Sequence, residues 1–101
     1  MNSTLTEYPL LVLSVNRALW GEVSCSLRSV QVEYQKSEIH LYCFYDGEIS
    51  EEDVEAMSSV ASLVAADFPH HNVYEHCIRI DCPNPLLYEK ERHVVFLRKE
   101  A

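Results

Sequence analysis

The spacing of apolar residues along the chain predicts six secondary-structure elements, beginning with a helix near the N-terminus. Its apolar positions recur at helical spacing: Leu11, Val15, Ala18 and Leu19. We expect this helix to open at Thr6 or Tyr8, with Pro9 in its first turn, where a missing N–H is tolerated. Gly21 marks the region in which the helix ends.

Two stretches with strict alternation follow, at residues 27–35 and 37–46, and they predict a hairpin. If residues 35–38 form the loop, the apolar residues oppose one another in three pairs: Tyr34 with Ile39, Val32 with Leu41, and Val30 with Cys43. The register is therefore consistent with one buried face. The other face pairs Glu33 with His40, Gln31 with Tyr42, and Ser29 with Phe44. We expect that face to be partly open to water, although it carries two aromatic residues.

The next element is a helix over residues 50–68, which Pro69 ends. Ser50 is placed as its N-cap, and Asp53 occupies the position of the acidic partner in a capping box. Because Asp is shorter than Glu, we expect only half of that box to form. Ile49 and Val54 stand at the positions of a hydrophobic staple. The predicted apolar stripe consists of Val54, Met57, Ala61, Val64 and Phe68.

Alternation at residues 72–81 and 92–99 predicts two more strands, joined by a loop that Pro83 and Pro85 restrict. The predicted order is therefore α-β-β-α-β-β. Hairpins favour antiparallel pairs, and two amphipathic helices can cover one face of a sheet. We expect an α+β fold in two layers, with an antiparallel sheet of about four strands and two helices. At 101 residues, the chain is expected to form a single domain over residues 1–101.

Charge changes the picture, because the net charge is −8 and nine acidic residues lie between Lys36 and Arg79 without any Lys or Arg. A surface of this sign repels nucleic acid and anionic membranes, so neither is expected as a partner. Six of these acids lie within ten residues and are called the acidic segment below: Asp46, Glu48, Glu51, Glu52, Asp53 and Glu55.

The acidic segment has two interpretations that the sequence leaves open. Acids in the first turn of a helix stabilise it through the helix dipole, by roughly 0.3–1 kcal/mol each. Alternatively, the segment is a surface for a basic protein partner. A calcium-binding loop is not expected, because Tyr42 and Phe44 would occupy ligand positions and cannot coordinate the ion.

Candidate chemistry is sparse elsewhere in the chain. The four cysteines, Cys25, Cys43, Cys77 and Cys82, contain no CxxC spacing, and we expect free thiols. The histidines match no zinc-ligand spacing, and no nucleophile elbow or phosphate-binding loop occurs. We therefore expect neither an enzyme nor a cofactor nor a metal site. The apolar run near the N-terminus is short and no Lys or Arg precedes it, so we expect no signal peptide and a cytoplasmic location.

Two motifs, "YDGEISEEDVE" and "VAADFP" between Tyr45 and Pro69, together with "LRSVQVEYQ", "CIRIDCP" and "VVFLRK", resemble small acidic bacterial immunity proteins. These are of the kind paired with contact-dependent growth inhibition toxins, and the resemblance runs from about Leu10 to Lys99. It implies a protein that neutralises a basic toxin domain, often a nuclease, by covering its cationic cleft. It carries over no residue roles.

In that interpretation the acidic segment stands where substrate phosphates would lie, and Tyr42 and Phe44 are candidate anchors, since aromatic residues dominate binding hot spots. Trp20 is a further candidate, although at a helix end we expect it in the core. The free protein is expected to be a monomer. The alternative function is a non-catalytic interaction module or a subunit of another cytosolic complex.

Overall fold

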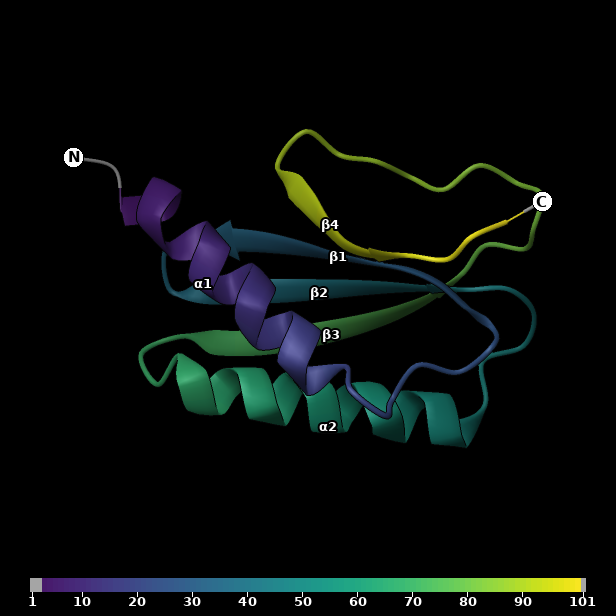
Figure 1. The fold of residues 1–101 in the computed structure, drawn as a ribbon, viewed down its shortest axis with the longest axis horizontal. Helices are drawn as coiled ribbons and strands as arrows, with labels where there is room; N and C mark the ends of the chain where they lie inside the picture. The colour runs from purple at the N-terminus through teal and green to yellow at the C-terminus, as the bar shows by residue number, and fades with distance from the viewer. Residues whose placement is uncertain (1–2, 101) are drawn as a thin grey trace.

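The computed structural model describes residues 3–100 of the chain (Figure 1). Two helices and four strands follow one another: α1 (Ser3–Ala18), β1 (Leu27–Gln35), β2 (Glu38–Tyr45), α2 (Glu51–Asp67), β3 (Asn72–Arg79) and β4 (Arg92–Leu97). The strands form one sheet in the order β3-β2-β1-β4. The predicted α+β class, with two helices and a sheet of four strands, agrees with this architecture.

The sheet is mixed, so the prediction of an antiparallel sheet is wrong for one pair of strands. β1 pairs antiparallel with β2 and with β4, whereas β2 and β3 run parallel. The cause is α2, which returns the chain to the end of the sheet at which β2 began, so that β3 sets out in the same direction. A helix between two strands is the usual way to connect parallel neighbours.

The hairpin of β1 and β2 has the predicted register. Val32 lies opposite Leu41 and Val30 opposite Cys43, while Gln31 lies opposite Tyr42 on the other face. The turn is tighter than expected, because Gln35 and Glu38 still pair and only residues 36–37 connect the strands. Alternating apolar residues on both strands thus fix which face of the sheet is buried.

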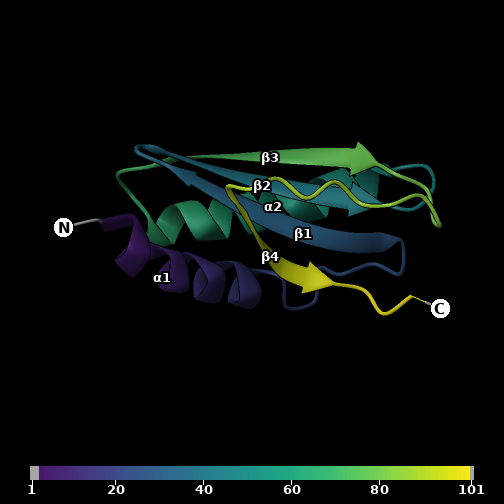
Figure 2. The same cartoon turned by 90° about the horizontal axis from the view of Figure 1, so that it is seen from above.

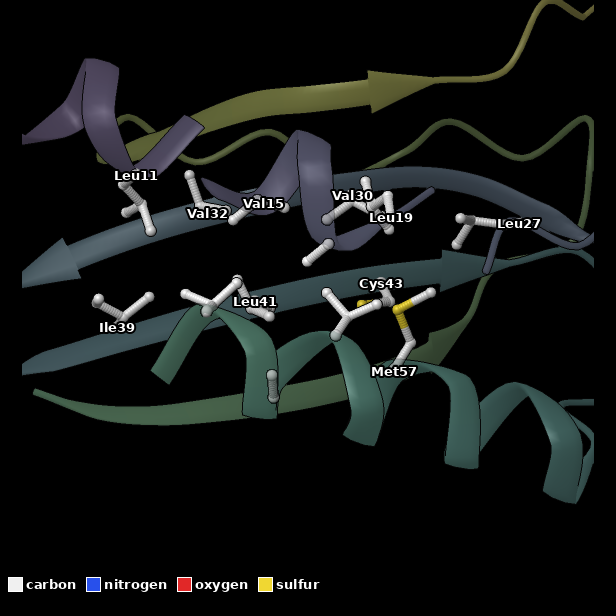
Figure 3. Close-up of a cluster of buried hydrophobic side chains, with 14 of the residues drawn as sticks. Leu11, Val15, Leu19, Leu27, Val30, Val32, Ile39, Leu41, Cys43 and Met57 are labelled. Atoms are coloured by element: carbon white, nitrogen blue, oxygen red, sulfur yellow. The ribbon is translucent and has the colours of Figure 1, made fainter. Parts of the chain in front are cut away.

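Both helices pack against the face of the sheet that carries these apolar residues, and they enclose the core with it (Figure 3). The helices and the turn after α1 contribute mainly these buried side chains: Leu11, Val15 and Ala18 from α1, Leu19 from the turn, and Met57, Val60, Ala61 and Val64 from α2. The apolar stripe predicted for the first helix is buried as expected, although the helix ends at Ala18, before the last predicted member, Leu19. The stripe predicted for α2 is wrong at Val54, which is exposed, because Val60 occupies the core position instead.

Helix α1 begins earlier than predicted, at Ser3 rather than at Thr6 or Tyr8. Pro9 therefore lies inside the helix and not in its first turn. A proline inside a helix removes one backbone hydrogen bond, and the packing of Leu11 and Val15 against the sheet holds the helix beyond it.

The opposite face of the sheet, called the outer face below, is partly covered by the long connection between β3 and β4. Figure 2 shows residues 80–91 crossing in front of β2 and β1, with α2 behind them. Gln31 on the outer face donates a hydrogen bond from Nε2 to the carbonyl of Leu87 at 3.0 Å. Arg28 donates to the carbonyls of Ile80 and Asn84 at 2.8 and 2.9 Å. These bonds fix the connection to β1.

Candidate functional site

The acidic segment begins α2, and one of its members serves the helix start directly. The backbone N–H of Asp53 donates to Ser50 Oγ at 3.0 Å, and Asp53 Oδ2 accepts from the Ser50 N–H at 3.3 Å. The capping box is therefore complete, and our expectation that Asp is too short to reach back is wrong. Asp53 is 8% exposed, so its carboxylate belongs to the fold and offers little surface to a partner.

Asp46 is also engaged inside the molecule. Its Oδ1 accepts from the backbone N–H of Cys82 at 3.1 Å, and its Oδ2 lies 3.4 Å from Nη2 of Arg98. These contacts join the end of β2 to the loop after β3 and to the C-terminal segment. The carboxylate is thus partly neutralised, which lowers its value as a contact for a basic partner.

The other four members of the acidic segment, Glu48, Glu51, Glu52 and Glu55, are exposed. Within residues 3–100, no hydrogen bond or ion pair engages their carboxylates. Like charges on one helix repel each other by a few tenths of a kcal/mol per pair. Four carboxylates without internal partners are available to a cation from outside.

A second arginine, besides Arg98, stands beside this segment. Arg79, the last residue of β3, donates to the two carboxylate oxygens of Asp81 at 3.0 and 3.2 Å. This pair raises the pKa of Arg79, and the charges of Glu48 and Asp46 raise it further. The charge of Glu48 is therefore partly offset, whereas Glu52 and Glu55 lie further along α2.

The two aromatic candidates from the sequence lie on the outer face, away from α2. Phe44 is 0% exposed, so it packs inside the molecule and cannot serve as an anchor for a partner. Tyr42 is half-buried and donates a hydrogen bond to Glu33 Oε1 at 3.0 Å, while the guanidinium of Arg92 lies 3.7 Å above its ring. Burial and Glu33 raise the pKa of Tyr42. Tyr42 and Phe44 therefore do not form a common surface with the acidic segment.

The outer face also carries a cluster of stacked rings that the sequence did not predict. His40 stacks on Tyr74 and on His76, and His76 stacks on Tyr42, with ring centres 4.9–5.2 Å apart. His40 Nδ1 and His76 Nε2 share a hydrogen bond of 2.9 Å. The cluster depends on β3 lying parallel to β2, which places His76 opposite Tyr42. The alternation of residues in β3 indicated that Tyr74 and His76 share one face of the strand. The expected antiparallel pairing with β2 would have placed them opposite other residues than His40 and Tyr42.

Trp20 is exposed, in contrast to the buried Phe44. It follows the end of α1 and is 77% exposed, so our expectation that it belongs to the core is wrong. It lines a hollow of about 300 Å³ between α1 and α2, together with Leu63 and Ala66 of α2 and Arg17 of α1. Trp20 therefore lies on the same layer of the molecule as the acidic segment.

The thiols and possible metal ligands show little organised chemistry. Cys43 is buried, Cys77 is half-buried, Cys25 and Cys82 are exposed, and all four are free. Burial raises the pKa of the Cys43 thiol, which keeps it protonated and unreactive. Among the described residues, no three His, Cys, Asp or Glu side chains gather into a possible metal site.

Comparison with known protein families decides the class of this acidic molecule. The model of the MafI2 immunity proteins matches residues 9–100, which is nearly the whole chain. The chain belongs to the MafI2 immunity protein family. No curated protein matches the chain.

Membership of the MafI2 family makes this chain a toxin-immunity protein, and such a protein has a toxin as its partner. The expected class is confirmed, but the contact-dependent growth inhibition type is not, because Maf toxins form a different polymorphic toxin system. Immunity families of this kind are typically non-enzymatic. Among the described residues, none of the helices has the length and apolar character needed to cross a membrane.

Proposed function

We propose that this MafI2-family protein neutralises a basic toxin domain with nuclease activity by covering its cationic substrate cleft with the acidic segment. The observation that carries the proposal is the set of exposed glutamates at the start of α2, which have no partner among the described residues. A nuclease cleft must attract a phosphate chain and is therefore lined with cations. Carboxylates spaced along a helix present the matching charge.

The chain's overall charge supports the same conclusion. At −8, the protein attracts a basic toxin before contact is made, and opposite charges raise association rates. Fast association matters for an immunity protein, because the toxin must be captured before it reaches its substrate. We propose that the protein acts in the cytoplasm, without enzymatic activity, and is a monomer until it binds.

The test uses a Maf toxin domain and a matched pair of double variants. Glu52→Gln with Glu55→Gln removes two charges from the acidic segment. Glu89→Gln with Glu91→Gln removes two charges from the exposed connection over the outer face. The first variant should associate at least about threefold more slowly at low salt, and the loss should shrink beyond ~0.15 M salt, where the Debye length is about 8 Å.

Equal association rates for the two double variants would remove the acidic segment from the interface. The nuclease part of the proposal is tested separately. The toxin domain alone should cleave RNA or DNA, and an equimolar amount of this protein should stop the cleavage. A toxin domain that cleaves neither nucleic acid would contradict the nuclease assignment, while its binding to this protein would still support neutralisation.

A further inference from the structure

The solvent-facing side of the two helices holds a pair of adjoining hollows, which we call the helix groove. One, of about 300 Å³, is lined by Ser14, Arg17, Ala18, Trp20, Leu63, Ala66 and Asp67. The other, of about 320 Å³, is lined by Leu10, Leu13, Ser14, Arg17, Asp67 and Phe68. Both are bordered by α1 and the C-terminal half of α2, so they form one depression divided by shared residues.

The rim of the helix groove is apolar and exposed to an unusual degree. Leu10, Leu13, Trp20 and Leu63 are each more than half exposed, with Trp20 the most exposed at 77%. Single exposed apolar residues are ordinary, but four around one depression indicate a binding surface. Tryptophan is among the residues most enriched at binding hot spots. Trp20 contributes little burial to the fold, so the fold gives no reason for its position.

Hydrogen bonds between α1 and the end of α2 connect the two sides of the helix groove. Asp67 Oδ2 accepts from Ser14 Oγ at 2.7 Å and from Arg17 Nη2 at 3.0 Å. The Ser14 hydrogen bond and the Arg17 guanidinium also lower the pKa of Asp67. A preformed depression binds more tightly than one that must be ordered on binding.

The helix groove is continuous with the acidic segment along a single stripe of α2. The stripe consists of Glu52, Glu55, Ser59, Leu63 and Ala66, all exposed and separated by three or four residues. Residues at this spacing lie on one face of a helix. Glu55 and Leu63 are separated by eight positions, which is about 12 Å along the axis. A standard interface covers about 800 Å² per partner, enough to span both features.

We propose that the helix groove receives an apolar side chain of the toxin domain, and that Trp20 is the central anchor of the interface. This rests on the proposed function and adds the second half of its contact surface. The segment that docks there is apolar at its centre and carries Lys or Arg on the side that meets Glu52 and Glu55. The charge pattern selects this occupant, because α2 carries only acidic charges. A second copy of this chain would bring its own carboxylates against them.

The deciding experiment compares exposed aromatic and leucine residues on the two sides of the molecule, with a Maf toxin domain as the probe. Trp20→Ala and Leu63→Ala alter the groove, and Tyr88→Ala and Leu97→Ala are the matched controls, since all four side chains are more than half exposed. Trp20→Ala should raise Kd at least about tenfold, mainly through faster dissociation and with little dependence on salt. Leu63→Ala should raise it by a smaller factor, and the controls by less than about twofold.

The outcomes separate the two proposals. If the wild-type protein does not bind the toxin domain, the proposed function fails and the groove assignment fails with it. If the wild-type protein binds and Trp20→Ala binds equally well, only the groove assignment fails. Sedimentation of the wild-type protein alone supplies the last outcome: a dimer that Trp20→Ala converts to a monomer would assign the groove to a second copy and overturn the proposal. All variants should retain the wild-type unfolding midpoint within a few degrees, because the substituted side chains are exposed.

Discussion

The centre of the outer face and the start of α2 differ in how their polar groups are used. On the outer face of the sheet, Gln31, Glu33 and Tyr42 are bonded to groups of the same chain. On the helix side, the glutamates of α2 have no partner among the described residues, and Trp20 stands in water. A group paired within the chain serves the fold, whereas an unpaired one is available to a partner. This contrast is a better guide to the proposed toxin contact than the presence of aromatic residues, which pointed to Tyr42 and Phe44.

The largest effect that tests this comparison comes from two leucines. Leu41 lies fully buried opposite Val32, and Leu63 is more than half exposed at the helix groove. Leu41→Ala should lower the free energy of unfolding by about 2–5 kcal/mol, because it removes buried methyl groups and leaves a cavity. Leu63→Ala should change it by less than about 0.5 kcal/mol. Chemical denaturation measures both.

A loss below about 1 kcal/mol for Leu41→Ala would contradict the buried face of the hairpin. A loss of similar size for Leu63→Ala would show that the helix groove is part of the core, and the contrast between the two surfaces would then disappear.

The hairpin was the most predictable part of the fold, for a physical reason. Two strands joined by a tight turn have few possible registers, and a slip by one residue would separate Val30 and Val32 from Leu41 on opposite faces. The start of α2 was similarly readable, because Ser50 and Asp53 act within one turn of helix. In both cases the interacting groups are close in sequence, so a local pattern carries the information.

The parts that could not be predicted depend on contacts between distant segments. The parallel pairing of β3 followed from the return path of α2, which the preference for hairpins obscured. Phe44 is buried on the outer face, the face that residues 80–91 cross in Figure 2, and nothing near Phe44 in the sequence indicates that path. Trp20 is exposed because α1 ends before it, at Ala18, and the chain turns away. The sequence therefore predicted the exposed charges of the candidate site correctly, but it did not predict which aromatic residues are exposed.

Two arginines provide the next test of the comparison between paired and available groups. Arg28 is buried, donates from Nε to Glu100 at 2.8 Å, and holds two backbone carbonyls of the connection over the outer face. Arg28→Ala should lower the free energy of unfolding by about 2–4 kcal/mol, because it removes a buried guanidinium and leaves its partly buried acceptors without a donor. Arg17→Ala removes an exposed ion pair with Asp67 and should cost less than about 1 kcal/mol.

The pKa of Glu100 gives an independent measurement of the Arg28 contact. The bidentate bond to Arg28, with a further bond to Arg98, lowers this pKa from its ordinary value of 4.5 to about 2. The stabilisation is therefore complete above pH 4.5 and is lost as the pH falls through the window down to about 2. Glu100→Gln should flatten the pH dependence of unfolding in that window. An unchanged profile would mean that the C-terminal segment is not held by Arg28 in solution.

The smallest expected effect concerns the ring cluster of the outer face. Burial lowers the pKa of His76 below its ordinary 6.5, and the neighbouring His40 lowers it further, against an opposing effect of Glu75. The folded state therefore favours neutral His76, so unfolding becomes easier as the pH falls below 6.5, where the unfolded chain binds the additional proton. His76→Gln should reduce this dependence, while His70→Gln, in the exposed turn after α2, should leave it intact.

The same histidine distinguishes the two surfaces in the complex. Because His76 lies in the ring cluster on the outer face, on the opposite side of the sheet from α2, its titration should be the same in the free protein and in the toxin complex. NMR of the His76 imidazole between pH 5 and 8 measures its titration midpoint in the free protein and in the complex. A His76 midpoint at or above 6.5 in the free protein would contradict the packing of the rings. A midpoint that moves on binding would place the outer face in the interface and reverse the assignment of the two surfaces.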